Sequence, residues 1–234
     1  MQLFYNPEIN QTTESFSFDR EESKHIIKVM RKASGDKLYV TNGLGYLFTT
    51  KITLGSENKC LVKIIAAEKV AARSYQLHMA VSPTKMNDRF EWFLEKATEF
   101  GVTEITPLIC ARTEKKTVKT DRMEKIIQSA MKQSLQSYLP KLNEPCNFSD
   151  FIRLADPNLR CIAHCEDADK KTLKSMLTPN YNFTILIGPE GDFTPKEIEL
   201  ALANNVMPVS LGHTRLRTET AAIAACHSVV FINQ

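Results

Sequence analysis

Hydrophobic and polar residues alternate in short runs over the first 70 residues of the chain. A period of two is typical of half-buried strands, and it predicts strands at residues 2–5, 15–18, 37–41, 46–54 and 60–67. Residues 19–30 predict a helix, with Asp19 as its N-cap and Glu22 closing a capping box. The turn sequence Asn42-Gly43-Leu44-Gly45 predicts a hairpin. Several short strands with one helix indicate a small β-barrel.

The pattern changes near residue 75, where strands begin to alternate with helices. The segment 68–74 has no strong period, so we expect it to separate a domain of residues 1–70 from a domain of residues 75–234. Apolar runs in the second domain predict strands at residues 76–82, 102–110, 159–164, 183–187 and 208–211. Helical periods predict helices at residues 88–100, 121–138, 149–155 and 171–177, another from residue 195, and a last one at 221–230. This alternation indicates an α/β fold with a parallel sheet.

Two loops near the C-terminus each follow an apolar strand and lead into a helix. The first is Gly188-Pro189-Glu190-Gly191-Asp192, and residues 211–220 form the second. Open α/β sheets bind ligands at the carboxyl ends of their strands, so both loops belong to one site if their strands are neighbours. Thr194, Pro195 and Glu197 predict a capped start for the helix after the first loop.

Charged side chains mark both loops. Glu190 has no structural role that the sequence reveals, and a solvated carboxylate fits the position as well as a functional one. In the second loop Arg215, Arg217 and Glu219 alternate with uncharged residues, a pattern that also fits a surface ion-pair cluster. The glycine turn before them and the helix after them favour a binding site. The alanine-rich helix 221–230 is suited to packing against another backbone or a second subunit.

Composition narrows the class of protein. With 43% hydrophobic residues, 24% charged residues and a formal net charge of +3, the chain has the balance of an ordinary globular protein. The weakly basic charge permits a nucleic-acid partner without requiring one. The sequence has no apolar run of membrane-spanning length and no secretion signal at its start, so we expect a cytoplasmic protein without a membrane partner.

Motifs for metal, phosphate and acyl-transfer chemistry are missing from the sequence. None of the six cysteines forms a C-x-x-C pair. Cys161 and Cys165 flank His164, but alternation along a buried strand would put both thiols on one face and the imidazole on the other, so we expect no metal site. Neither loop has the spacing of a nucleotide-phosphate loop, and no G-x-S-x-G or H-E-x-x-H sequence occurs.

The two loops also carry a resemblance to a known family. Its elements are Ile187-Gly188-Pro189-Glu190-Gly191, then Leu211-Gly212, then Leu216-Arg217-Thr218-Glu219-Thr220-Ala221. Residues 25–31 with Gly35-Asp36, residues 96–102 with 105–107, and residues 128–134 match further segments in the same order. Together they resemble the SPOUT-class RNA methyltransferases, and within that class the enzymes that methylate N3 of a uridine in 16S ribosomal RNA. The family often has Gly at the position of Asp192, and commonly Leu at the positions of Met30 and Phe100.

The resemblance implies a fold, a cofactor and an assembly. The fold would be an α/β domain with a parallel sheet closed by a deep trefoil knot, a rare exception to unknotted chains, preceded by a PUA-like β-barrel that binds RNA. The assembly would be a homodimer. S-adenosylmethionine would bind in the two loops, mainly through backbone groups. The cofactor-binding residues implied are Leu186, Ile187, Gly188, Pro189, Glu190, Gly191, Leu211, Gly212, Leu216, Arg217, Thr218 and Thr220.

The resemblance also implies the 16S rRNA of the small ribosomal subunit as partner, with an unpaired or flipped target base. Methyl transfer to a uracil N3 requires loss of the imide proton, so Glu190 and Glu219 are candidate bases. Arg217 is a candidate for stabilising charge on a uracil oxygen. Each of two basic stretches alone would be interpreted as a solvated face, but with an RNA substrate they become candidate phosphate contacts. They comprise Lys24, Lys28, Arg31 and Lys32, and Arg112, Lys115, Lys116, Lys119 and Arg122.

Other functions stay open on the sequence alone. One is a SPOUT enzyme that acts on another RNA or another base. A second, from a different class, is a non-catalytic module that only binds ribosomal RNA. A nucleotide hydrolase fits less well. The presence of Gly188, Glu190 and Gly212 favours an enzyme, because a pseudo-enzyme would be free to lose them.

Overall fold

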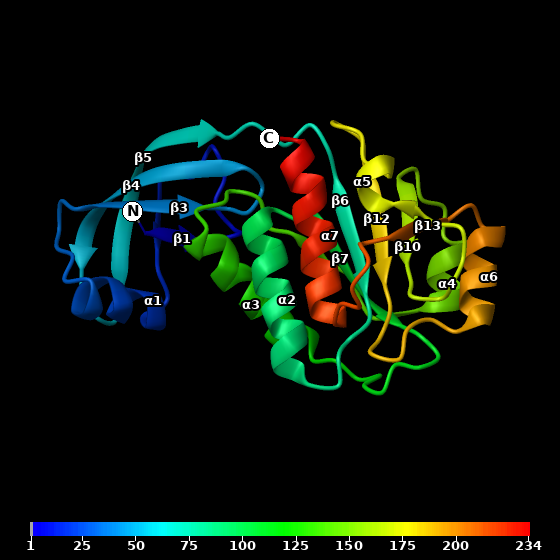
Figure 1. The fold of residues 1–234 in the computed structure, drawn as a ribbon. Coiled ribbons are helices and arrows are strands. Elements are labelled where there is room, and N and C mark those ends of the chain that lie inside the picture. The colour runs from blue at the N-terminus through cyan, green and yellow to red at the C-terminus, as the bar shows by residue number, and fades with distance from the viewer. Residues whose placement is uncertain (1) are drawn as a thin grey trace. The chain divides into compact units, whose positions relative to one another are not determined.

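The structure is a computed structural model that describes residues 2–234. The chain divides into two compact units, shown as ribbons in Figure 1. The first unit holds the chain up to Ala72 together with Met131–Leu139. The second holds Arg73–Ala130 and Pro140–Gln234. The sequence pattern gave no sign that a segment near residue 135 belongs with the N-terminal strands.

The first unit is built on a five-stranded sheet in the order β1-β3-β4-β5-β2. Its strands are β1 (Leu3–Tyr5), β2 (Ser15–Ser17), β3 (Lys37–Thr41), β4 (Tyr46–Gly55) and β5 (Cys60–Lys69). β1 pairs parallel with β3 and the other pairs are antiparallel, so the predicted hairpin at Asn42–Gly45 joins β3 to β4. Phe4, Phe48 and Ile26 are buried in the core of this unit.

The predicted N-terminal helix consists of two consecutive segments, an α-helix followed by a π-helix. α1 (Arg20–Lys24) starts at Asp19, whose side chain accepts a hydrogen bond from the Glu22 N–H, as expected. The predicted capping box is not closed in the described structure, because the Glu22 carboxylate forms an ion pair with Lys132 at 2.9 Å instead. From His25 to Val29 the chain continues as a π-helix, η1. Lys24 therefore lies on α1 and Lys28 on η1, whereas Arg31 and Lys32 follow the end of the helix.

The segment Met131–Leu139 is held to the first unit by backbone hydrogen bonds. The Gly45 N–H donates to the Ser137 carbonyl at 2.8 Å, and the Leu139 N–H donates to the Gly43 carbonyl at 2.9 Å. The helix that precedes it, α3 (Thr120–Gln133), ends five residues before the predicted end at Tyr138 (138 − 133 = 5). Leu135 has a left-handed backbone (φ 59°), which no α-helix continues through.

The second unit contains an eight-stranded sheet in which every strand pair is parallel, as predicted. The order is β11-β13-β10-β12-β6-β7-β8, and β9 also pairs with β7. The strands are β6 (Leu77–Val81), β7 (Glu104–Ile109), β8 (Lys141–Leu142), β9 (Cys146–Asn147), β10 (Leu159–Ala163), β11 (Lys171–Thr172), β12 (Phe183–Ile187) and β13 (Met207–Ser210). β6 and β12 are buried along their whole lengths, as continuous apolar runs in a covered sheet must be. The trefoil knot stays a prediction.

Helices cover both faces of this sheet, as Figure 1 shows. α7 (Thr218–Ile232) packs on β6 and β12, and α2 (Asn87–Phe100) packs against α7. On the other face, α4 (Phe148–Arg153) and α6 (Pro195–Ala203) share one apolar cluster with the sheet. The short α5 (Leu173–Met176) also contacts α7. No helix in residues 2–234 is long and apolar enough to cross a membrane.

Local capping signals are confirmed in this unit. α6 begins with the predicted capping box: Thr194 accepts from the Glu197 N–H, the Glu197 carboxylate accepts from the Thr194 N–H, and Pro195 lies in the first turn. α2 ends at Phe100, as predicted, and the Gly101 that follows it has a left-handed φ of 86°. These positions follow from residue chemistry alone, which explains why the sequence predicts them.

Gly45 provides a test of how the segment 131–139 is anchored. An added Cβ at Gly45 (φ +87°) would overlap the Tyr138 ring, whereas at Gly35 (φ +97°) it would meet only Lys51 Cε at 4.0 Å. Both alanine variants incur the cost of a left-handed backbone, about 1–2 kcal/mol. We expect Gly45→Ala to lower the free energy of unfolding further than Gly35→Ala does, measured by urea unfolding followed by circular dichroism. Equal losses of unfolding free energy in the two variants would show that the close packing of Tyr138 on Gly45 contributes little to stability.

Candidate active site

Three loops meet at the carboxyl edge of the parallel sheet. The sequence predicted two, those after β12 and β13, and placed them together if these strands were neighbours. They are not: β10 lies between them and pairs with both. The loop after β10 therefore lies between the two predicted loops, and the three together form the site.

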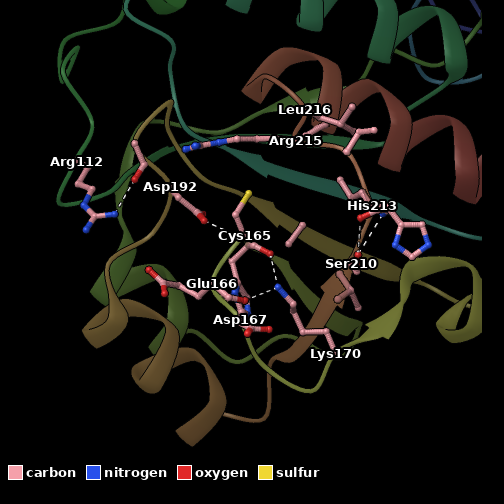
Figure 2. Close-up of a pocket in the computed structure, with 18 residues that line it drawn as sticks. Arg112, Cys165, Glu166, Asp167, Lys170, Asp192, Ser210, His213, Arg215 and Leu216 are labelled. Carbon is pink, nitrogen blue, oxygen red and sulfur yellow. Dashed lines mark hydrogen bonds between the residues drawn. The ribbon is translucent and has the colours of Figure 1, made fainter.

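Three hollows open along these loops and share residues. The first, of about 580 Å³, is bordered by the loops after β10 and β13 and contains Asp192, Lys170 and Arg215 (Figure 2). The second, of about 290 Å³, lies beside Gly188–Glu190 and again includes Arg215. The third, of about 780 Å³, extends from Arg215 and Arg217 to the start of α2. The shared residues make them neighbouring parts of one site.

The first predicted loop is fixed by contacts from distant segments. Glu190 Oε1 accepts a hydrogen bond from the Lys85 N–H at 2.9 Å, so this carboxylate does have a structural contact that the sequence did not reveal. Arg112 Nη1 donates to the Gly191 carbonyl at 2.7 Å. A Cβ at Gly188 would lie 3.0 Å from the Phe193 ring, which explains glycine at this close approach.

Asp192 links the loops after β10 and β12. Its backbone is left-handed (φ 64°), a conformation that Gly, Asn and Asp adopt more readily than other residues. Its Oδ2 accepts from the Cys165 N–H at 2.7 Å, and its Oδ1 accepts from the Phe193 N–H at 2.8 Å. Asp192 therefore bonds both within its own loop and to the loop after β10, and Figure 2 shows the carboxylate directed to the Cys165 backbone.

His164 lies in the loop after β10 and is buried without a partner. β10 ends at Ala163, so the predicted alternation through Cys165 is wrong: Cys161 is buried in the strand and Cys165 is exposed in the loop. His164 is 7% exposed, and neither ring nitrogen has a hydrogen-bond partner within residues 2–234. Burial lowers its pKa, and the nearby Lys170 ammonium acts in the same direction. In the described part of the chain, no group of three or more His, Cys, Asp or Glu side chains could hold a metal ion.

The second predicted loop is shorter than expected. α7 begins at Thr218, so Thr218, Glu219 and Thr220 form its first turn, and Arg217 is the residue before it. A carboxylate there is stabilised by the positive end of the helix dipole. Glu219 is 6% exposed, and its Oε1 lies 3.8 Å from Arg89 Nε. Its other oxygen, Oε2, has no hydrogen-bond partner among the described residues.

The predicted cofactor residues differ in what they present to these hollows. Leu186 is fully buried in the core, so its side chain is not available to a ligand. Thr220 and Glu219 border the third hollow only. The other ten predicted cofactor residues border the first or second hollow, and they are Ile187, Gly188, Pro189, Glu190, Gly191, Leu211, Gly212, Leu216, Arg217 and Thr218.

Three of the nine predicted RNA-contact residues bond to other groups of the protein through their side chains, and six do not in the described structure. Besides holding Gly191, Arg112 contacts the Phe193 carbonyl. Lys115 contacts the Asn87 side chain, and Arg122 forms an ion pair with Glu91 at 2.7 Å. Within residues 2–234 no side-chain hydrogen bond or ion pair engages the remaining predicted residues, which are Lys24, Lys28, Arg31, Lys32, Lys116 and Lys119.

Sequence reasoning missed two groups of residues around the site. The first is the loop from His164 to Lys170, which could have been found because it follows an apolar strand as the other loops do. The second is Arg89 and Trp92 on α2, which border the third hollow. No local signal marks them, because their relation to Glu219 depends on how α2 packs against α7.

Comparisons with known proteins agree on one family. A model of the RNA methyltransferase domain matches residues 71–230, and a model of the RNA methyltransferase PUA domain matches residues 18–65. The chain is 31% identical over 209 residues to the ribosomal RNA small subunit methyltransferase E of Rickettsia conorii, covering 88% of this chain and 85% of that protein.

Solved structures with similar folds give the same result. A probable rRNA-methyltransferase from Porphyromonas gingivalis has 35% identity and a TM-score of 0.92, covering 100% of this chain and 98% of that one. A methyltransferase from Legionella pneumophila, determined with bound cofactor SAM, has 31% identity and a TM-score of 0.85, covering 97% and 96%.

The buried His164 should make stability depend on pH. Its folded pKa is lowered, so below about pH 6.5 the unfolded chain binds this proton more readily than the folded chain does. The contribution of neutral His164 to stability is therefore fully present above that pH and should be lost as the pH decreases through it. We expect the urea concentration at the midpoint of unfolding to decrease between pH 7.5 and pH 5.5. This decrease should be smaller in the His164→Phe variant. The exposed His213→Gln variant should behave like the parent, and an unchanged slope in His164→Phe would contradict the prediction. His78, whose pKa burial also lowers, accounts for part of the remaining slope.

Proposed function

The chain belongs to the ribosomal RNA small subunit methyltransferase E family, and from this premise we propose that it methylates N3 of a uridine in the 16S rRNA of the small ribosomal subunit, with S-adenosylmethionine as methyl donor. The single observation that carries the chemistry is that Glu219, which borders the third hollow, has a buried oxygen without a hydrogen-bond partner among the described residues. An acceptor held in this way is suited to take a proton from an N–H group. The family relation supplies the identity of the substrate.

The residues present fit S-adenosylmethionine. The first and second hollows lie where parallel sheets bind nucleotide-like ligands, at the carboxyl ends of the strands. The His164 ring has no hydrogen-bond partner among the described residues, so a polar atom of a ligand in the first hollow would relieve the cost of its burial. Gly188, Leu211 and Gly212 would hold the cofactor chiefly through their backbone groups. When bound, the cofactor supplies an electrophilic methyl group on sulfur.

The protein's share of the reaction is to prepare the uracil. The imide N–H is a weak acid, so little of the base is ionised at neutral pH and a positioned base accelerates loss of the proton. We assign this role to Glu219, which is buried and has a free oxygen. Arg217 immediately precedes α7 and borders the same hollow, where its guanidinium can stabilise charge on a uracil oxygen. Glu190 accepts a hydrogen bond from the Lys85 backbone, which favours a role in shaping the loop.

Three further properties complete the proposal. Lys116 and Lys119 are exposed and unpaired in the described structure, and we propose that they contact RNA phosphates, as do Lys24, Lys28 and Arg31 in the first unit. We propose a homodimer, for which the 66% exposed Phe231 on α7 is an available apolar contact. We also propose that the protein acts in the cytoplasm, where ribosomal subunits are.

Glu219→Gln tests the base. The amide keeps the size of the side chain but is a much poorer proton acceptor, so we expect the turnover number to fall by roughly 10²–10⁴. The measurement is transfer of labelled methyl groups to 16S rRNA from a strain that lacks this protein, with calorimetry to follow cofactor binding. Cofactor affinity should persist. Glu199→Gln on the exposed side of α6 is the matched control. Unchanged turnover in Glu219→Gln would remove Glu219 from the chemistry.

Salt tests the phosphate contacts. Each phosphate contact releases bound counterions, so log affinity falls with log salt concentration by about 0.7–0.9 per contact. We expect the KM for rRNA to rise steeply between low and moderate salt. Lys116→Ala and Lys119→Ala should each make that slope shallower. Lys174→Ala, on α5, provides a control with the same loss of charge, and a salt-independent KM would argue against phosphate binding.

A further inference from the structure

The third hollow has an aromatic wall that the proposed chemistry does not use. Trp92 on α2 borders it and is 46% exposed, although most large apolar side chains of α2 are buried. Arg89 lies three residues earlier, so both side chains are on one face of the helix. Glu219 borders the same hollow and is nine-tenths buried, and its Oε2 has no hydrogen-bond partner among the described residues. An indole and a residue with a buried acceptor thus border one space of about 780 Å³.

The exposed Trp92 indole and the buried Glu219 carboxylate indicate the chemistry of a ligand that would fit this hollow. An exposed indole is a stacking surface for a planar ring, and stacking on aromatic side chains is how proteins hold single-stranded bases. A buried carboxylate oxygen without a partner calls for an N–H donor, because an unmet acceptor is costly in a low-dielectric site. Arg89 contacts Oε1 of Glu219 at 3.8 Å, which leaves Oε2 for the ligand.

We propose that the third hollow receives an unpaired pyrimidine base of the RNA, stacked on Trp92, with its ring N–H directed to Glu219 Oε2. This inference rests on the proposed function and deepens it by assigning the place of the acceptor base. Arg215 and Arg217 also border the second hollow, so a base in the third hollow would lie next to the proposed cofactor site. Trp92 is then a substrate-binding residue.

The charge of the hollow favours RNA as its occupant. Arg89, Arg215 and Arg217 border it, against the exposed Asp88 and the buried Glu219. An excess of cations beside an aromatic surface suits a phosphodiester strand with a splayed base. A second copy of this chain is the competing occupant, and it differs from RNA in that it would cover Trp92 without any added nucleic acid.

Trp92 is the only tryptophan of the chain, so its fluorescence reports on this hollow alone. We expect heptauridylate, added to the full protein with S-adenosylhomocysteine, to quench the indole emission. An abasic heptamer with the same phosphates should bind without quenching. Hepta(3-methyluridylate), which lacks the N–H donor, should quench but bind more weakly. Equal quenching by the abasic strand would overturn stacking, and equal affinity for the methylated strand would overturn the Glu219 contact.

Self-association is tested in the same experiment. If a second copy of the chain covers Trp92, its emission will change on dilution from micromolar to nanomolar protein without RNA. That result would overturn the inference. An emission spectrum independent of protein concentration supports an open hollow.

Kinetics separate this inference from the proposed function. Removing a stacking side chain weakens single-strand binding by roughly tenfold or more, so Trp92→Leu should raise the KM for rRNA by that factor. Trp92→Phe should restore most of the loss, because a phenyl ring also stacks. Leu202→Ala, on α6 with the same 46% exposure, is the control for a surface apolar change. If the parent protein methylates uridine and Trp92→Leu has an unchanged KM, the inference fails and the proposed function stands. If the parent methylates no uridine, the proposed function fails.

Discussion

The parallel pairing of β13, β10, β12 and β6 is the constraint on which the site depends. Parallel strands covered by helices on both faces leave only their ends in contact with water. Their carboxyl ends therefore bring three loops to one edge, where each loop must satisfy its own polar groups. Asp192 and Arg112 do this by hydrogen-bonding to backbone atoms of neighbouring segments. The loops are consequently fixed before any ligand arrives, which lowers the entropy cost of binding.

Two buried side chains at this edge have polar atoms without a hydrogen-bond partner among residues 2–234. They are His164, with both ring nitrogens, and Glu219, with one oxygen. Folded proteins seldom leave such groups without a partner, because burial removes water and provides nothing in return. A ligand that supplied the missing partner would recover this free-energy cost. One orphaned group borders the first hollow and the other borders the third, so they mark opposite ends of the same site.

Sequence reasoning succeeded where a few neighbouring residues decide the structure. The Thr194–Glu197 box, the end of α2 at Phe100 and strand β12 were predicted to the residue, because each depends on local hydrogen bonding or an apolar run. It failed where partners are distant. The position of β10 between β12 and β13 is set by the whole sheet, and the burial of Glu219 depends on α2, more than 100 residues earlier. The end of α3 was missed because Leu135 turns toward the strands of the first unit.

The membership of Met131–Leu139 in the first unit has a consequence for the time course of synthesis. A growing chain that has reached Ala72 has made every strand of that unit but not the segment that bonds to Gly43 and Gly45. A further 67 residues (139 − 72) must be added first. At about 5–20 residues per second, this takes roughly 3–13 s. During that interval the backbone groups of Gly43 and Gly45 in the β3–β4 turn lack their hydrogen-bond partners in residues 131–139. The N-terminal unit is therefore completed only after part of the second unit has left the ribosome.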